Sequence, residues 1–496
     1  MNRWLLLLAL FFTFPARADD ISATGRGVVR IVTIASAQGQ VIGFGHGSGF
    51  AVAPDKIVTN AHVVELAMKY PANVLIGVVP SEGVKSYQGK VIAYDPKRDL
   101  ALIQLSGTRL PPAVLYAGPV SEGDPVISLG YPGNVDVATA QSSADYIKPL
   151  APVRSDGVSS GRRTLTGTDV LLHTAAIARG NSGGPLLDRC GRVLGVNSAL
   201  TRAEEGDASF GFAIANTELV QFLAEAKQPV TSVGLPCTSI EDRIARDRDA
   251  DARAVEQSTA ASRDAATRAE VAHQAALEQA RSDAETRREN VMGLAALLLV
   301  ASALVFGGAG LLEGKGRRRM AIWLAAGGAI GMLAAVILFV LRPDARAIPE
   351  AVLAVPPAAP LYHGKMTCSI LPDRSRVTVS AITDVGIDWS VKGCMNGRTQ
   401  YAEAGGGRWE RMLVPDDEAT VSILAFNPAT RTYSNTRYML SAPQMEQARK
   451  LRTGVELKTC TPDQGALNGL ASQQTAIRDA LPPLPNEMLV YSCKPG

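Results

Sequence analysis

The chain has 496 residues, enough for about three domains, and its formal net charge is only +3 with both signs spread along the sequence. No basic patch stands out, so the charge pattern argues against a nucleic-acid partner.

The first residues have the pattern of a secretory signal peptide. Arg3 precedes the apolar run Trp4–Phe14, and Ala16-Arg17-Ala18 is a small-residue cleavage site. An uncleaved membrane anchor is the alternative. In either case we expect residues 1–18 to direct export of the segment that follows.

Residues 19–237 are expected to form the first domain. Short β-branched runs such as "GVVRIVTIA" and "KIVTNAHVV" alternate with Gly and Pro, which predicts an all-β barrel or sandwich. A short helix is expected over 217–226, where Leu219, Phe222 and Leu223 would share one face.

Three polar residues in this domain have the types that nucleophilic catalysis needs. Ser182 lies among glycines in "ARGNSGGPLLD", and His62 ends the run "IVTNAH". An imidazole has a pKa near neutrality, so it can take the hydroxyl proton and pass it on. Asp99 opens the apolar run "DLALIQL", where a carboxylate needs a partner. The alternatives are a turn serine, a histidine near the core and a capping aspartate.

The order and spacing of these strings resemble those of chymotrypsin-like serine proteases, in particular the HtrA/Deg branch, over roughly residues 25–226. "GSGFAV", "YDPKRDLALIQL" and "GNSGGPLLDRCGRVLGVNSAL" carry the likeness. It implies a mainly β, chymotrypsin-like double β-barrel of two six-stranded barrels, with Ser182 as nucleophile, His62 as base and Asp99 orienting it. It further implies protein or peptide substrates and no metal or cofactor. Whether the chain forms a homo-oligomer stays open.

The same resemblance assigns further site residues. The backbone N–H groups of Gly180 and Ser182 would bind the oxyanion. Ala176 would lie at the base of the specificity pocket, which indicates a small apolar side chain before the cut. The predicted pocket walls are Ile177, Asn197, Ser198 and Ala199. No PDZ-like domain is recognisable after the protease, which is a departure from that branch.

Residues 238–290 are expected to form a helical stalk, because the stretch 239–290 lacks Gly and Pro and is rich in Ala, Arg and Glu. Alanines at spacings of three and four form a thin seam. A coiled coil, a solvated single helix and a partly disordered linker remain open.

Two apolar runs, 291–312 and 320–341, are each long enough to cross a bilayer. The loop between them, 313–319, holds four basic residues, which predicts a cytoplasmic loop. A buried core hairpin is the alternative. Gly327 and Gly331 form a G-x-x-x-G that would let the two helices pack closely. We therefore expect a hairpin in a bacterial inner membrane, with both soluble parts on the periplasmic or extracytoplasmic side.

A Pro/Ala linker is expected over 342–360, and a small β-rich domain, either all-β or α+β, over 361–496. Its strand-like runs are "RVTVSAI", "VGIDWSV" and "TVSILAF". All the cysteines lie in the parts predicted to be exported, which indicates disulfides. Within the first domain only Cys190–Cys237 can pair. Three connectivities are open for Cys368, Cys394, Cys460 and Cys493.

The sequence as a whole predicts a membrane-anchored extracytoplasmic serine endopeptidase, acting in envelope protein quality control or regulated proteolysis. The alternative is a membrane scaffold or sensor whose protease-like domain binds peptides without useful turnover.

Overall fold

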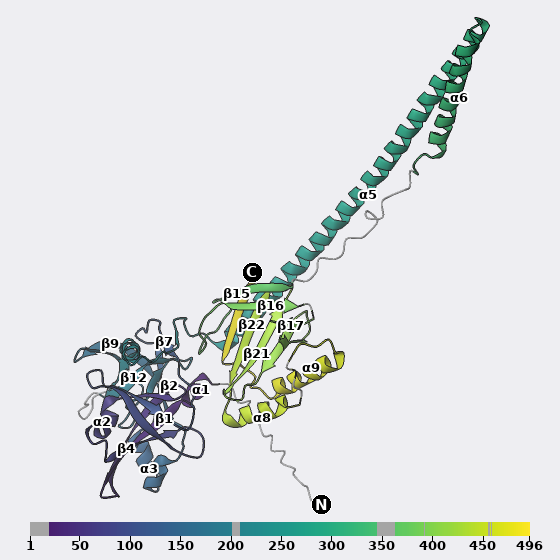
Figure 1. Cartoon of the computed structure of the whole chain (residues 1–496). Helices are drawn as coiled ribbons and strands as arrows, with labels where there is room; N and C mark the ends of the chain where they lie inside the picture. The colour runs from purple at the N-terminus through teal and green to yellow at the C-terminus, as the bar shows by residue number, and fades with distance from the viewer. Residues whose placement is uncertain (1–18, 201–208, 345–362, 391, 455–456, 458) are drawn as a thin grey trace, which may run out of the picture. The chain divides into compact units, whose positions relative to one another are not determined.

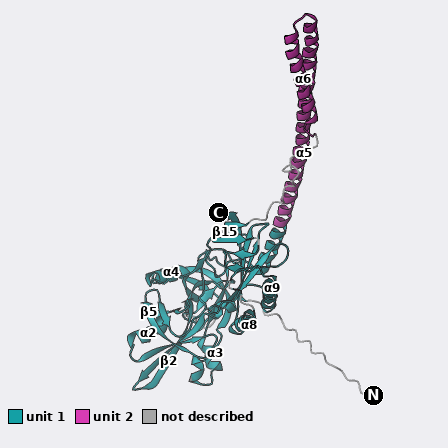
Figure 2. Ribbon diagram, turned by 45° about the vertical axis from the view of Figure 1, so that its right-hand side comes forward, with its two compact units in different colours: residues 1–252, 362–496 teal, residues 253–361 magenta. Residues whose placement is uncertain are grey.

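The computed structural model describes residues 19–200, 209–344, 363–390, 392–454, 457 and 459–496. The predicted signal peptide and most of the predicted linker over 342–360 lie outside these residues. Met1–Ala252 and Tyr362–Gly496 form one compact unit, and Arg253–Leu361 form a second (Figure 2).

The N-terminal part of the large unit forms the first barrel, drawn in purple to blue in Figure 1. Six strands close on themselves in the order β1-β2-β3-β6-β5-β4. Branched side chains suit the pleated surface and fill the interior, where Ile31, Ile57 and Ile103 are fully buried. The elements of this part are α1 (Asp20–Gly25), β1 (Val28–Ala37), β2 (Gln40–Ala53), β3 (Lys56–Thr59), α2 (Ala61–Lys69), β4 (Val74–Pro80), β5 (Tyr87–Asp95) and β6 (Leu100–Leu105).

The second barrel follows directly. Its strands pair in the order β11-β8-β9-β10-β13-β12, and β12 pairs again with β11, so six strands form a closed ring. The expected double barrel is therefore confirmed. Its elements are β7 (Leu115–Tyr116), β8 (Pro125–Gly130), α3 (Gly133–Thr139), the 3₁₀ helix η1 (Ser143–Ile147), β9 (Val153–Leu165), β10 (Thr168–His173), β11 (Pro185–Leu187), β12 (Val193–Leu200), β13 (Gly211–Ala215), α4 (Asn216–Glu225) and β14 (Ser232–Val233).

Helix α4 matches the helix expected over 217–226, and the three apolar residues of its predicted face are all buried. Strands β7 and β14 extend the second sheet beyond β12.

The two barrels meet at the loop that carries Ser182. The backbone N–H of Ser48 on β2 donates to the carbonyl oxygen of Ser182 at 2.8 Å. The hydroxyl of Ser48 donates to the carbonyl oxygen of Gly180 at 2.7 Å. The first barrel therefore helps to fix the conformation of a loop that belongs to the second.

The C-terminal part of the large unit is an α+β domain. Its sheet has the order β18-β17-β16-β15-β23-β22-β21-β20-β19. Helices α8 and α9 cover one face, where Met445 and Ile477 pack against Met412 and Val421. The elements are β15 (Gly364–Ile370), β16 (Val385–Ser390), β17 (Cys394–Met395), β18 (Thr399–Gln400), β19 (Ala402–Glu403), β20 (Trp409–Leu413), β21 (Thr420–Asn427), β22 (Thr432–Met439), α8 (Ala442–Arg452), α9 (Gln464–Asp479) and β23 (Glu487–Pro495).

The strand expected at "RVTVSAI" is wrong. Only Arg376 in this run makes a β-bridge, to Met488. The backbone N–H groups of Thr378, Val379 and Ser380 donate instead to one carboxylate oxygen of Glu487, at 2.8, 3.0 and 3.0 Å. Glu487 is fully buried, and a buried carboxylate is costly unless hydrogen-bond donors surround it. These three N–H groups therefore bind the carboxylate and do not pair with a neighbouring strand.

All described cysteines are paired. The structure joins Cys190 to Cys237, the one bond available within the first domain. In the C-terminal domain it joins Cys368 to Cys493 and Cys394 to Cys460. Sequence alone had left three connectivities open there.

Helix α1 joins the protease-like part to the C-terminal domain within this unit. The carboxylate of Asp20 lies 2.5 Å from Nη2 of Arg376 and accepts from the amide of Asn486 at 2.8 Å. Burial raises the pKa of Asp20, although the Arg376 guanidinium opposes that shift.

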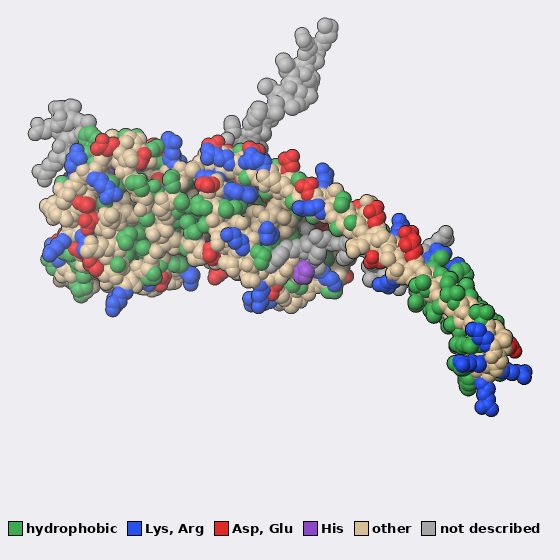
Figure 3. Space-filling view, turned by 90° about the horizontal axis from the view of Figure 1, so that it is seen from above, with side chains coloured by type: hydrophobic (Ala, Val, Ile, Leu, Met, Phe, Trp, Pro, Cys, Tyr) green, Lys and Arg blue, Asp and Glu red, His purple; other side chains and the backbone are tan. Residues whose placement is uncertain are grey.

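A single helix, α5 (Ile240–Gly314), contains both the predicted stalk and the first apolar run, and α6 (Arg318–Val340) contains the second. Both helices are long and apolar enough to cross a membrane. Figure 3 shows apolar side chains covering the far part of this helical pair and Lys and Arg side chains at its tip.

The close contact between α5 and α6 involves one of the two glycines expected, Gly331, together with Gly328. A Cβ at Gly331 would lie 2.2 Å from the Ser302 hydroxyl, and one at Gly328 would lie 3.1 Å from the Ser302 carbonyl. Gly327 has open space around it, so the G-x-x-x-G prediction is wrong at its first glycine.

Candidate active site

His62 lies in the first turn of α2, directly after strand β3. The β3 strand ends at Thr59, and Asn60 is the N-cap residue of the helix. This strand-to-helix junction holds the imidazole at the surface, with 48% of the side chain exposed. The exposed ring can therefore meet an external substrate.

Asp99 faces His62 from the turn before β6. Its two carboxylate oxygens lie 3.0 and 2.9 Å from Nδ1 of His62, and the first also accepts the His62 backbone N–H at 3.0 Å. A carboxylate at Nδ1 favours the tautomer with the proton there, which leaves Nε2 free to accept a proton.

The turn at Asp99 is held in an unusual backbone conformation. Asp99 has a φ of +53°, in the left-handed region that is costly for residues other than glycine. The side-chain amide of Asn60 donates to the Asp99 carbonyl oxygen at 2.8 Å and helps to hold this conformation.

The Asp99 carboxylate is held in its charged form. Burial would raise its pKa, but hydrogen bonds from His62 and Ser198 outweigh burial, and the pKa falls below its usual value. The carboxylate therefore remains charged at neutral pH and can stabilise an imidazolium on His62.

Ser182 lies in the loop before β11, and its hydroxyl donates to the carbonyl oxygen of Ser198 at 3.1 Å. The Ser198 hydroxyl in turn donates to the Asp99 carboxylate at 2.7 Å. One residue thus contacts both the candidate nucleophile and the candidate orienting carboxylate.

Backbone donors in the Ser182 loop are arranged as an oxyanion site requires. The carbonyl oxygens of Arg179 and Asn181 accept from Gly133 and Gly184 at 2.6 and 2.9 Å. In a trans peptide the N–H points to the side opposite the preceding carbonyl oxygen. Because Gly133 and Gly184 hold the carbonyls of Arg179 and Asn181, the N–H groups of Gly180 and Ser182 point away from those two partners. Among the described residues neither N–H has a hydrogen-bond partner.

Glycine is required at position 180. Its φ is +100°, and a Cβ there would lie 2.3 Å from the carbonyl oxygen of Tyr131. Any larger residue would have to displace this loop.

The predicted specificity residues have separate positions. Ala176 is exposed and Ile177 is partly buried. Asn197 is fully buried, and its amide donates to Ser128 at 2.9 Å and to the carbonyl of Pro185, so its side chain faces the barrel interior rather than a surface pocket. Ala199 pairs with Phe212 through the backbone.

Ser198 has a role that sequence reasoning missed. It was expected as a pocket wall, but its side chain supports Asp99. Nothing in a motif distinguishes this serine from other strand residues.

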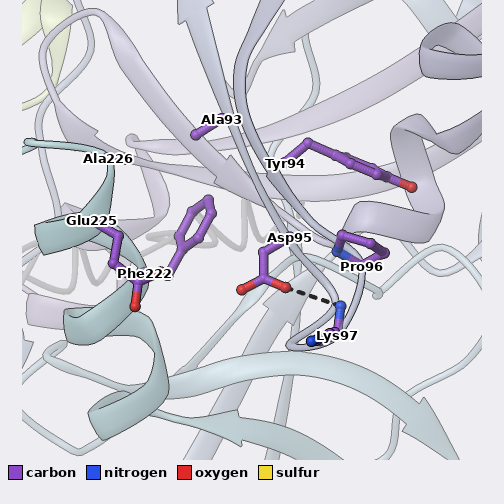
Figure 4. Close-up of a pocket in the computed structure, with 8 residues that line it drawn as sticks. All are labelled: Ala93, Tyr94, Asp95, Pro96, Lys97, Phe222, Glu225 and Ala226. Atoms are coloured by element: carbon purple, nitrogen blue, oxygen red, sulfur yellow. Dashed lines mark hydrogen bonds between the residues drawn. The ribbon is translucent and has the colours of Figure 1, made fainter.

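A cleft of about 390 Å³ lies beside the turn that carries Asp99, and none of the three candidate catalytic residues lines it (Figure 4). Arg98 bridges this region by bonding Asp95, Glu218 and Glu225 at 2.8, 3.2 and 2.8 Å. The network ties the Asp99 turn to α4.

Within the described part of the chain, no group of three or more His, Cys, Asp or Glu is placed to hold a metal ion.

A family model for the trypsin-like peptidase domain matches residues 47–196. The serine protease Rv3671c of Mycobacterium tuberculosis (strain ATCC 25618 / H37Rv) is 34% identical over 221 residues, which cover 44% of this chain and 51% of that protein. A probable periplasmic serine endoprotease, DegP-like, of Chlamydia trachomatis is 32% identical over 207 residues, covering 40% and 38%.

Among solved structures, the active form of the Rv3671c protease from M. tuberculosis is 28% identical and covers 44% of this chain and 87% of that one, with a TM-score of 0.34. The chain matches about half of the length of Rv3671c and less of the DegP-like protein. Residues 47–196 of this chain are therefore a trypsin-like peptidase domain, homologous to Rv3671c and to the DegP/HtrA serine proteases.

Proposed function

We propose that the chain is a serine endopeptidase that cleaves proteins by acyl transfer at Ser182. The observation that carries this proposal is the pairing of His62 Nδ1 with the charged Asp99 carboxylate. The two unpaired N–H groups at Gly180 and Ser182 support it, because donors in that position stabilise a tetrahedral oxyanion.

In the first half of the reaction, the Ser182 hydroxyl oxygen attacks the carbonyl carbon of the scissile peptide, and His62 Nε2 takes its proton. The N–H groups of Gly180 and Ser182 bind the developing oxyanion, while Asp99 stabilises the imidazolium. His62 then gives the proton to the leaving amine, and the C–N bond breaks to leave an acyl ester on Ser182.

In the second half, a water molecule attacks the ester and gives a proton to His62, which returns it to the Ser182 oxygen. The acid product leaves and the hydroxyl is restored. Before the initial attack on the substrate, the Ser182 hydroxyl must break its hydrogen bond to the Ser198 carbonyl oxygen, which requires only rotation of the Ser182 side chain.

The substrate carries a small apolar side chain before the cut. Ala176 supports this proposal, because an alanine supplies neither charge nor a hydrogen bond to a longer polar side chain. A library of peptides varied at that position tests it, and a preference for Arg or Lys would contradict it.

The enzyme is held at a bacterial inner membrane by α5 and α6, with its soluble parts on the periplasmic side. The basic residues between the helices support this orientation. Its tasks there are envelope protein quality control or regulated proteolysis. A reporter active only outside the cytoplasm should work when fused after Gly496 and stay silent at Gly316; the reverse pattern would overturn the orientation.

A second candidate function is a scaffold or sensor whose protease-like domain binds peptides without turnover. The hydrogen bond from Ser182 to the Ser198 carbonyl favours it, since the hydroxyl is then not directed to the base.

Labelling with a fluorophosphonate separates the two candidates, because only an activated serine reacts. We expect the wild-type chain to be labelled at Ser182 and to cleave casein. The variant Ser182→Ala should fold normally, bind no probe and lose about 10⁴–10⁶-fold in kcat. Ser282→Ala, which removes an exposed hydroxyl from α5, is the matched control. A wild-type chain that neither reacts nor cleaves would leave the scaffold as the function.

A further inference from the structure

The peptide bond between Arg179 and Gly180 is held from outside its own loop. The backbone N–H of Gly133, the first residue of α3, donates to the Arg179 carbonyl oxygen at 2.6 Å. On its other side, a Cβ at Gly180 would lie 2.7 Å from Nε2 of His46. Because the peptide is planar, these contacts set the direction of the Gly180 N–H.

Helix α3 is itself fastened to the first barrel by a buried ion pair. One carboxylate oxygen of Asp136 accepts from Nη2 of Arg30 at 2.7 Å, and the other lies 3.3 Å from Nε2 of His46. The side chains of Arg30 and Asp136 are only 3% and 6% exposed. Arg30 lies on β1 and His46 on the neighbouring strand β2, so a rigid sheet carries both.

The guanidinium of Arg30 also orders the segment after α3. It donates to the carbonyl oxygens of Asp145 and Tyr146 at 3.4 and 3.2 Å, and it lies 4.7 Å from the centre of the Tyr131 ring. Burial lowers the pKa of His46, although the Asp136 carboxylate opposes that shift.

We propose that Asp136, held by Arg30, and the N–H of Gly133 are positioning groups for the Gly180 oxyanion donor. This inference rests on the proposed protease function. None of these residues touches the substrate, and they act only through the orientation of the Arg179–Gly180 peptide.

The surroundings of the ion pair argue that it does more than fill the core. A cavity of about 300 Å³ adjoins it, lined by Arg30, Asp136, Tyr146 and Lys148 among others, so close packing does not hold α3 on this side. Nε of Arg30, one Asp136 oxygen and Nε2 of His46 are buried without a hydrogen bond. Such a cluster contributes little to stability compared with apolar packing, but it fixes one arrangement of α3.

The first test removes the Gly133 donor. Proline is tolerated at the first position of a helix, and Pro132 already has the extended backbone that a following proline requires. Gly133→Pro removes the N–H and directs a ring carbon at the Arg179 carbonyl. Gly133→Ala is the matched control, because its Cβ meets the Arg179 oxygen and His46 at 3.2 Å but the N–H remains.

We expect Gly133→Pro to lower kcat by roughly 10–10²-fold with KM nearly unchanged, since a misdirected donor costs less than the 10²–10³-fold of a deleted one. Affinity for a peptidyl boronic acid, whose adduct is tetrahedral, should fall by the same factor. Gly133→Ala should keep most of the activity.

The second test removes the charge on Asp136. Asp136→Asn should lower kcat and boronate affinity together, whereas Asp156→Asn, which makes the same change in an exposed pair with Arg154, should alter neither. Thermal unfolding identifies any variant that does not fold, and the other test then decides.

Wild-type kcat and boronate affinity in a folded Gly133→Pro or Asp136→Asn variant would overturn the inference while leaving the protease intact. Equal losses in Asp136→Asn and Asp156→Asn would overturn it too. A wild-type chain without turnover or fluorophosphonate labelling would instead refute the proposed function, and the inference would fall with it.

Discussion

Replacing Ser198 with alanine isolates the support of Asp99 from the rest of the site. The substitution removes the hydroxyl that donates to the Asp99 carboxylate at 2.7 Å. It leaves the Ser198 carbonyl, which accepts from Ser182, and both contacts between Asp99 and His62. The change therefore affects one hydrogen bond of one carboxylate.

The size of the effect follows from the charge of the acceptor. A hydrogen bond to a charged group contributes about 1.5–3 kcal/mol. The Asp99 side chain is 28% exposed, so water replaces part of the lost donor and the lower end of this range applies. If the bond matters equally in the transition state, about 1.5–2 kcal/mol corresponds to a loss of roughly 10–30-fold in kcat/KM.

The assay is steady-state cleavage of a peptide by Ser198→Ala, with thermal unfolding measured in parallel. We expect kcat to fall while KM changes little, because Asp99 acts on the imidazolium of the transition state. The variant keeps the Ser198 carbonyl oxygen that accepts from the Ser182 hydroxyl, so a change in that bond would not explain such a loss. Unchanged kcat/KM in a folded variant would refute the support role, and a loss as large as that of Ser182→Ala would show that the whole site had collapsed.

Three further changes address the stability of the protease-like part. Arg98→Ala removes the bridge from Asp95 to Glu218 and Glu225, so we expect a lower unfolding midpoint and reduced kcat; an unchanged midpoint would count against the network. Replacing Cys190 and Cys237 together with serine opens a loop with a separation of 47 residues, and we expect a loss of roughly 4 kcal/mol in denaturant unfolding; a non-reduced digest that joins Cys190 to a cysteine beyond Cys237 would contradict the pairing. Burial lowers the pKa of His173 to about 4, so the unfolded chain binds the proton first and stability falls as pH drops from about 6.5 towards 4, by about 3 kcal/mol in total. His173→Leu should flatten that dependence, and an equally steep curve would exclude His173 as its source.

The parts of the fold that depend on residue type were accessible from the sequence. Branched apolar runs between glycines predicted the barrel strands, since side-chain shape decides whether a pleated surface packs. The chemistry of a nucleophile, a base and a carboxylate pointed to Ser182, His62 and Asp99, and the structure brings His62 and Asp99 into contact. Counting cysteines left a single bond for the first domain, which the structure contains.

Contacts between distant side chains were not accessible in the same way. Arg30 and Asp136 are separated by 106 residues, and each alone resembles an ordinary surface charge. His46 lies in a glycine-rich stretch that gives no hint of burial. The error at Gly327 has a related origin, because the helix face that meets α5 depends on rotation about the axis, and the adjacent glycines Gly327 and Gly328 look alike in the sequence.

The contacts that pattern analysis missed most completely use backbone atoms as partners. The carbonyl oxygens of Arg179 and Ser198 hold the site, and three successive N–H groups around Val379 bind Glu487 where a strand was expected. Every residue carries nearly the same backbone groups, so the sequence holds little record of which of them are used. Side-chain replacement cannot remove such partners either. For this reason Ser198→Ala tests only the hydroxyl, and a change of backbone chemistry such as Gly133→Pro is needed to test a donor in the main chain.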